Sequence, residues 1–214
     1  MNGSMIRYVL SHIVRIEGLL LFLPCLVALI YREQQGVIYA GLGLICILLG
    51  SFLGMRRPRN NTFYLKEGCI TTALSWLVLS AIGALPFVIT GEIPDYTNAL
   101  FETISGFTTT GSSILSDVEA LSHTSLFWRS FTHWVGGMGI LVFMLTIIPM
   151  VGGSPINLMR AESPGPEVDK TMPKMRQSAG LLYIIYAVLT LAQIILLVLS
   201  RMPVFDAICL SLGT

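Results

Sequence analysis

Residues 98–113 read NALFETISGFTTTGSS and lie between two long apolar segments, although they are themselves too polar and too few to cross a bilayer. The first half has apolar residues at helical spacing, which predicts a short half-helix. In the second half three threonines favour extended backbone, and Gly111 permits dihedral angles that a β-branched residue resists. The stretch therefore predicts a half-helix that runs into a kinked strand.

Two interpretations of this stretch are open. Non-helical backbone at membrane depth is tolerated only where it is buried in protein or lines a watery cavity, so a pore or substrate pathway is one interpretation. A Thr- and Gly-rich segment between helices is also typical of an extramembrane loop. The rest of the chain is needed to choose between them.

The composition is that of an integral membrane protein. Hydrophobic residues make up 54% of the 214 residues and charged residues 12%, against about 25% charged residues in soluble domains. The net charge is +1, but Lys and Arg crowd into a few connecting segments and are absent elsewhere. This argues against nucleic-acid binding, which needs a contiguous basic face. We expect the four cysteines to be small, buried, apolar residues.

The motifs give no support to an enzyme. The three histidines show no His-Glu-x-x-His spacing, and no Gly-rich phosphate loop precedes a helix. His133, beside Trp134, is expected to be an interfacial polar residue rather than a base or a ligand. We therefore expect neither enzymatic activity nor a cofactor.

Uncharged runs long enough to span a bilayer, which takes roughly 20 residues as a helix, occur along the whole chain. They are residues 34–55, 68–91, 130–159 and 177–200. The first apolar segment spans only if it extends from Tyr31 back to Tyr8, past Arg15 and Glu17. We expect these two charges to mark a helix end at the membrane surface. The alternative is that Glu17 pairs with a neighbouring helix.

Glycine and proline indicate helix contacts and helix ends. Small surfaces for close helix packing are predicted in one run at Gly41, Gly43, Gly50 and Gly54. The three glycines of residues 134–139 favour packing over a hinge. Pro94-Asp95 predicts the start of the half-helix, because the acid suits the positive end of the helix dipole.

The distribution of basic residues predicts the orientation. Most Lys and Arg residues fall in connections on one side of the membrane, which places the N-terminus in the cytoplasm by the positive-inside rule. The Thr-Gly stretch then opens to the outside, among acidic residues that favour cations. We expect Glu102, inside the half-helix, to anchor the loop by hydrogen bonds rather than to contact an ion.

Three motifs resemble the TrkH branch of the Trk/Ktr/HKT potassium transporters. They are FETISGFTTTG at residues 101–111, WVGGMG at 134–139 and RAESPGP at 160–166. The resemblance covers nearly the whole chain in order. It implies an all-α polytopic membrane protein, in which four repeats of helix, pore half-helix, filter loop and helix resemble potassium channels and follow two extra N-terminal helices.

The resemblance also implies the domain boundaries. Residues 1–62 would be the N-terminal helix pair, 63–151 the first pore repeat, 152–176 a cytoplasmic loop and 177–214 the truncated start of a second repeat. Within the first repeat the expected parts are a helix at 67–91, a pore half-helix at 95–107, the filter at 108–113 and a helix at 126–150.

The function implied by the resemblance is potassium uptake through a filter of backbone carbonyls that replace the water shell of the ion. Potassium would be held by the carbonyls of Thr109, Thr110 and Gly111, and Glu102 would support the filter. The whole filter segment that matches the family motif comprises Thr108, Thr109, Thr110, Gly111, Ser112 and Ser113.

By resemblance the partners would be membrane lipid, a second copy in a homodimer and a cytosolic nucleotide-binding regulatory subunit of the TrkA type. The location would be the bacterial plasma (inner) membrane, with several spans. Four filter segments surround one pore in the family, so we expect this chain not to conduct alone. The alternative is a membrane scaffold or assembly subunit without a pore of its own, in which the small-residue helices form the interaction surface.

Overall fold

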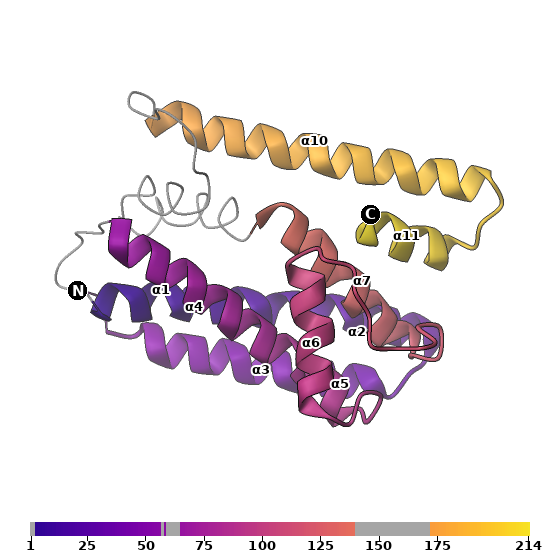
Figure 1. The fold of residues 1–214 in the computed structure, drawn as a ribbon, viewed down its shortest axis with the longest axis horizontal. Coiled ribbons are helices and arrows are strands. Elements are labelled where there is room, and N and C mark those ends of the chain that lie inside the picture. The colour runs from indigo at the N-terminus through magenta and orange to yellow at the C-terminus, as the bar shows by residue number, and fades with distance from the viewer. Residues whose placement is uncertain (1–2, 57, 59–64, 140–171) are drawn as a thin grey trace.

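The structure is a computed structural model that describes residues 3–56, 58, 65–139 and 172–214, with the backbone alone described for 65, 66 and 172–179. All regular secondary structure in these ranges is helical, which confirms the all-α prediction. The helices, shown in Figure 1, are α1 (Gly3–Leu20), α2 (Phe22–Tyr31), α3 (Gln35–Gly54), α4 (Leu65–Gly83), α5 (Leu85–Ile89), α6 (Tyr96–Phe107), α7 (His123–Gly137), α10 (Met172–Leu199) and α11 (Val204–Gly213).

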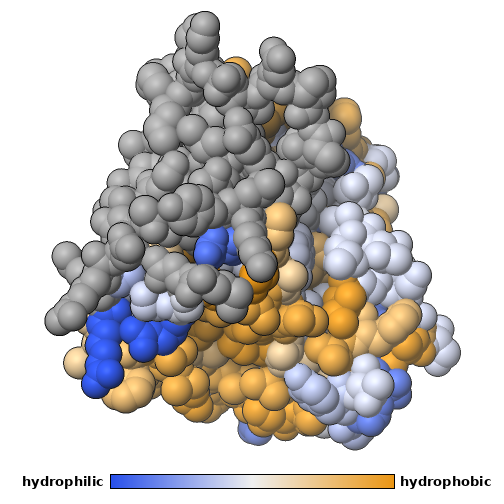
Figure 2. Space-filling view, turned by 60° about the vertical axis from the view of Figure 1, so that its left-hand side comes forward, coloured by the Kyte–Doolittle hydropathy of each residue, from blue (hydrophilic) through white to orange (hydrophobic). Residues whose placement is uncertain are grey.

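Four stretches of the described chain are long and apolar enough to cross a membrane. They are Gly3–Tyr31, Gln35–Gly54, Glu67–Ile89 and Gly180–Leu199. The first joins α1 to α2 and the third joins α4 to α5, where Pro86 lies in the first turn of the new helix. Figure 2 shows the broad hydrophobic surface that the helices present, bordered by hydrophilic residues.

Glycines allow α1 and α3 to pack closely. A Cβ atom added to Gly43 would lie 2.8 Å from the carbonyl oxygen of Gly18, and one added to Gly50 would lie 2.6 Å from the backbone of α1. At Gly54 the place of a Cβ atom is taken by the movable guanidinium of Arg15. Close packing is thus confirmed at Gly43 and Gly50, but not at Gly41, which has no atom within 4 Å of the Cβ position.

The expectation that Arg15 and Glu17 mark a helix end is wrong. Helix formation continues back to Gly3, so Glu17 lies near the middle of the span and is 0% exposed. The apolar residues before Arg15 pack into the bundle and keep the helix going. Arg15 itself reaches along α3, where its Nη2 donates to the carbonyl oxygen of Ser51 at 3.4 Å.

The half-helix α6 begins where Pro94-Asp95 predicted. The side chain of Asp95 accepts a hydrogen bond from the Asn98 N–H at 2.9 Å and so caps the helix. Helix α6 crosses the bundle between α4 and α7 (Figure 1), and it packs against both. A side chain on Gly136 of α7 would clash with the carbonyl oxygen of Phe107, which is the last residue of α6.

The C-terminal part repeats the order of a long helix, a short turn and a shorter helix. Helix α10 passes along one side of the bundle, and α11 folds back from its end to pack against α7 (Figure 1). Of the helix expected at 126–150, the structure describes α7, which starts earlier, at His123, and ends at Gly137. Residues 140–150, the expected cytoplasmic loop up to residue 171 and the motif at 160–166 lie outside the described residues.

The cysteines are not all buried. Cys46 and Cys209 are buried and Cys25 is partly buried, as expected, but Cys69 is exposed on α4. The expectation was therefore wrong for Cys69, because an apolar span in a membrane protein need not turn every small residue inward.

Candidate functional site

The candidate site is the loop that follows α6, and it begins with the cap that ends this helix. The Thr109 N–H donates to the Gly106 carbonyl oxygen at 2.9 Å, and the Thr110 N–H donates to that of Ser105 at 2.9 Å. With Thr109 at φ +55°, this is a Schellman motif, the common end of a helix. The expected extended backbone is therefore wrong at Thr108, which has φ −85° and ψ 1°, and at Thr109.

Thr109 occupies a position where glycine is usual. A left-handed conformation costs an L-residue about 1–2 kcal/mol, and β-branched residues adopt it rarely. The hydroxyl of the preceding Thr108 donates to the carbonyl oxygen of Ile104 at 2.7 Å and lies 2.8 Å from the Thr110 hydroxyl. These contacts tie the cap together on both sides of the strained residue.

Gly111 also has a left-handed backbone. Its φ is +75°, and no atom lies within 4 Å of the position that a Cβ atom would take. The backbone conformation therefore requires glycine here, although there is space for a side chain. All six residues of the predicted filter, 108–113, are exposed in this chain.

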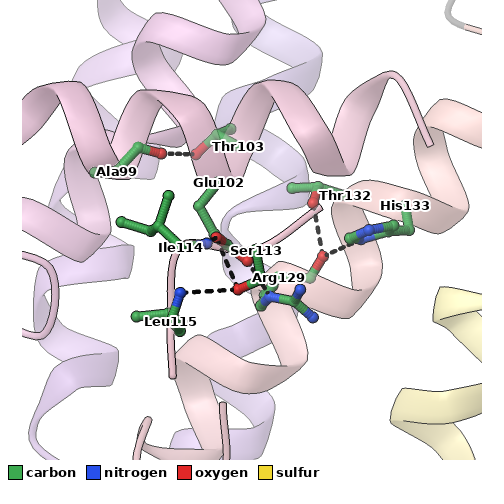
Figure 3. Close-up of polar contacts among 9 residues, drawn as sticks. All are labelled: Ala99, Glu102, Thr103, Ser113, Ile114, Leu115, Arg129, Thr132 and His133. Atoms are coloured by element: carbon green, nitrogen blue, oxygen red, sulfur yellow. Dashed lines mark hydrogen bonds and ion pairs between the residues drawn. The ribbon is translucent and has the colours of Figure 1, made fainter. Parts of the chain in front are cut away.

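Glu102 holds the far end of the loop against α6. Its side chain is 1% exposed, and its Oε2 accepts from the Ser113 hydroxyl and from the Ile114 N–H, each at 3.1 Å. Its Oε1 accepts from Nε of Arg129 on α7 at 2.5 Å (Figure 3). One carboxylate thus joins the half-helix, the loop and α7. The sequence indicated the hydrogen bonds of Glu102 to the loop but gave no sign that Arg129 is its partner.

Two further carboxylates hold the N-terminus of α7. Glu33 accepts from the backbone N–H groups of His123 and Thr124, both at 2.9 Å, and from the Thr124 hydroxyl. Glu92 accepts from the Ser122 N–H at 2.7 Å. Burial would raise the pKa of Glu33, but the hydrogen bonds from Thr124 and His123 outweigh it, so its pKa lies below the ordinary value. Sequence analysis did not assign this capping role to Glu33 or Glu92.

Interior contacts fix the rest of α7. The indole N–H of Trp128, which is 1% exposed, donates to the Gly83 carbonyl oxygen at 3.0 Å, where α4 gives way to α5. The Tyr39 and Ser125 hydroxyls lie 3.0 Å apart. His133 is only 8% exposed and its Nδ1 lies 3.0 Å from the Arg129 carbonyl oxygen. Its place at the membrane interface stays a prediction.

The chemistry of the site is that of neutral oxygen atoms. Residues 108–113 offer threonine and serine hydroxyls and main-chain carbonyls. Within the described ranges, no three His, Cys, Asp or Glu side chains are grouped so as to hold a metal ion. Backbone carbonyls in place of a water shell are the ligands that alkali cations take in selective pores.

Comparison with known proteins identifies the family of the chain. A family model described as "TrkH: Cation transport protein" matches residues 37–214. The chain is 40% identical to the Trk system potassium uptake protein TrkH of Salmonella typhimurium, over 94% of this chain and 44% of that protein. It is 31% identical to the uncharacterized cation transporter MJ1485 of Methanocaldococcus jannaschii, over 97% of this chain and 43% of that protein.

A solved structure has the same fold. The crystal structure of the potassium transporter TrkH from Vibrio parahaemolyticus matches with a TM-score of 0.79 and 30% identity, covering 99% of this chain and 42% of that one. The chain thus spans less than half the length of the curated relatives it matches. Because the family model matches most of its length, the chain belongs to the TrkH family of cation transport proteins.

Proposed function

We propose that this chain serves potassium uptake across the bacterial plasma membrane and contributes one filter segment to a channel-like pore. The observation that carries the proposal is the loop after α6. It is exposed, it has left-handed backbone at Thr109 and Gly111, and it is held at its far end by Glu102. Its relatives include proteins described as Trk system potassium uptake proteins.

In the proposed mechanism potassium is bound by the main chain. Carbonyls of Thr109, Thr110 and Gly111 replace the water shell of potassium, and Thr108, Ser112 and Ser113 complete the segment. A left-handed residue reverses the local course of the backbone, so two of them in three positions set the directions of successive carbonyls. The Glu102–Arg129 pair would keep this shape from relaxing when an ion leaves.

The remainder of the pore would come from other segments. We propose that residues 63–151 are one pore repeat and that 177–214 begin a second, after an N-terminal helix pair at 1–62. The assembled transporter would be a homodimer regulated by a cytosolic nucleotide-binding subunit of the TrkA type, with no cofactor beyond the transported ion.

We propose that the N-terminus and residues 161–177 are cytosolic and that the loop at 117–124 is external. Single cysteines at Lys170 and Ser122, in a chain freed of its four native cysteines, test this orientation. Impermeant thiol reagent added to intact cells should label position 122 and leave position 170 unlabelled. Labelling of position 170 under those conditions contradicts the orientation.

A non-conducting scaffold or assembly subunit is the second candidate. The span Gly180–Leu199 of α10 has none of its residues buried against the rest of the chain, which leaves a large apolar surface for another subunit. The two candidates differ in what they predict for potassium.

Growth of a transport-deficient cell tests the proposed function. The complete transporter that contains this chain should restore growth at limiting potassium and should take up rubidium as a potassium substitute. Gly111→Val in that transporter should reduce both growth and rubidium uptake, whereas both should be unchanged if this chain is a scaffold without a pore segment. Expression of the wild type without growth or rubidium uptake refutes the uptake function.

A further inference from the structure

Glu17 lies at a junction of three parts of the bundle. It is 0% exposed and sits near the middle of the span Gly3–Tyr31. Its neighbour Gly18 packs on α3, where a Cβ atom on Gly18 would lie 2.9 Å from Cβ of Cys46. On the other side Oε1 of Glu17 is 3.4 Å from the Cβ position of Gly83, at the break between α4 and α5.

The half-helix α6 reaches the same point. The Cβ position of Gly83 is 3.0 Å from Cγ2 of Thr103 and 3.2 Å from the ring of Phe107, both in α6. Phe107 is the last residue of α6 before the proposed filter, and it is 2% exposed. Glu17 therefore lies close to the end of the half-helix that leads into the loop.

Neither carboxylate oxygen of Glu17 has a hydrogen-bond partner in the described part of the chain. The polar groups around it are already used: the Thr103 hydroxyl donates to the Ala99 carbonyl oxygen at 2.8 Å, and the Gly83 carbonyl accepts from Trp128. Glu102 is as deeply buried, yet its two oxygens have three partners. Both glutamates are thus buried, but only Glu102 has hydrogen-bond partners.

No cation faces Glu17 from the elements packed against it, as far as the described residues go. Helix α3 contributes the thiol of Cys46, whereas α4 and α6 contribute Gly83, Thr103 and Phe107, which do not titrate. Arg15, on the same helix, is turned toward Ser51 of α3. An ionised carboxylate without a partner in the interior of a membrane protein is strongly unfavourable.

We infer that Glu17 is a proton-binding site inside the helix bundle. Its carboxyl is neutral while α1, α4 and α6 are packed together, and it gives up the proton only when this packing opens. Because α6 leads into the loop at 108–113, occupancy of Glu17 by a proton is linked to the position of the half-helix. The inference rests on packing and burial, and it stands or falls separately from the transport function.

Infrared spectroscopy tests the protonation directly, in the complete transporter that contains this chain. The difference spectrum of wild type minus Glu17→Gln at neutral pH should contain the carbonyl stretch of a protonated carboxylic acid. Loss of a carboxylate band instead would show that Glu17 is ionised and would overturn the inference.

Stability as a function of pH tests the linkage to packing. As pH rises, the thermal midpoint of wild type should fall relative to Glu17→Gln, since alkali favours the open state in which the carboxyl can ionise. The apolar variant Glu17→Met should fold and behave like Glu17→Gln, whereas Glu102→Gln should have a lower midpoint at every pH. Parallel pH profiles for wild type and Glu17→Gln, or failure of both Gln and Met variants to fold, would overturn the proposal.

Discussion

Single residues at the end of α6 determine the shape of the loop. Thr109 and Gly111 both have positive φ, but only Gly111 has a residue type suited to it. Strain at a β-branched residue persists only where its surroundings hold it, and such outliers cluster at functional sites. The cap hydrogen bonds of Thr109 and Thr110 and the carboxylate of Glu102 are those surroundings.

Replacing Gly111 should damage the proposed filter more than replacing a packing glycine. Gly111→Val places a β-branched side chain at φ +75°, at a cost of order 1–3 kcal/mol in backbone strain, and we expect it to relax by turning a carbonyl away. Gly137→Ala is the control, because its methyl group would meet the movable hydroxyl end of Tyr186 at 2.6 Å and would lie 3.9 Å from Cγ2 of Thr109, an ordinary van der Waals distance. The ratio of potassium to sodium uptake should fall in the first variant alone. Equal ratios in wild type and Gly111→Val would remove the filter assignment.

The buried Glu102–Arg129 pair should matter for both stability and selectivity. The uncharged amide of Glu102→Gln has a single oxygen, so it cannot accept the hydrogen bonds from Arg129 and from the loop as the carboxylate does. Removing one partner of a buried ion pair lowers stability by up to about 3–5 kcal/mol. We expect a lower thermal midpoint and a reduced ratio of potassium to sodium uptake. In a double-mutant cycle with Arg129→Gln, the effects on the midpoint should be far from additive. Additive effects would show that the two side chains act independently.

At the scale of helices, the sequence predicted what depends on neighbouring residues. The Asp95 cap, the apolar spacing of α6 and the close contacts of Gly43 and Gly50 all follow from local pattern and residue size. The length of the first span did not, because a charge at Glu17 looks like a helix end until the other helices are present to bury it.

Contacts between distant segments could not be predicted either. Arg129 and Glu102 are 27 residues apart, and Glu33 and Thr124 are 91 residues apart. Only the packing of α2, α6 and α7 brings these groups together, and no spacing in a single sequence encodes that. The left-handed Thr109 was missed for a related reason, since threonine by itself favours extended backbone.

The start of α7 should depend on the charge of Glu33. The pKa of Glu33 is lower in the folded protein than its ordinary value of about 4.3. The ionised side chain therefore stabilises the fold at pH values above about 4.3, and this stabilisation is lost as the pH falls through the pKa of the folded protein. At neutral pH Glu33→Gln should lower the thermal midpoint, by about 1–2 kcal/mol in stability, and the gap from wild type should close in acid. Glu119→Gln, at an exposed position in the loop that leads into α7, is the control. A gap that persists unchanged below the ordinary carboxyl range would contradict the capping role.

At the scale of the whole molecule, the described helices leave much of their apolar surface uncovered. Exposed large side chains run along α3 and α10, and the six residues of the proposed filter are exposed as well. A membrane covers apolar side chains, but it offers nothing to hydroxyls and carbonyls at the end of a half-helix. The loop therefore needs either water or further protein around it.

The chain from Met1 to Thr214 is expected to insert in a membrane without conducting potassium by itself. Replacing a hydration shell takes carbonyls from several sides at once, and the loop at 108–113 supplies one side. The other sides would have to come from further copies of the loop or from other segments. In liposomes, the purified chain should give a potassium flux no greater than that of its Gly111→Val variant. A potassium-selective flux that Gly111→Val abolishes would show that the 214 residues suffice to form the pore.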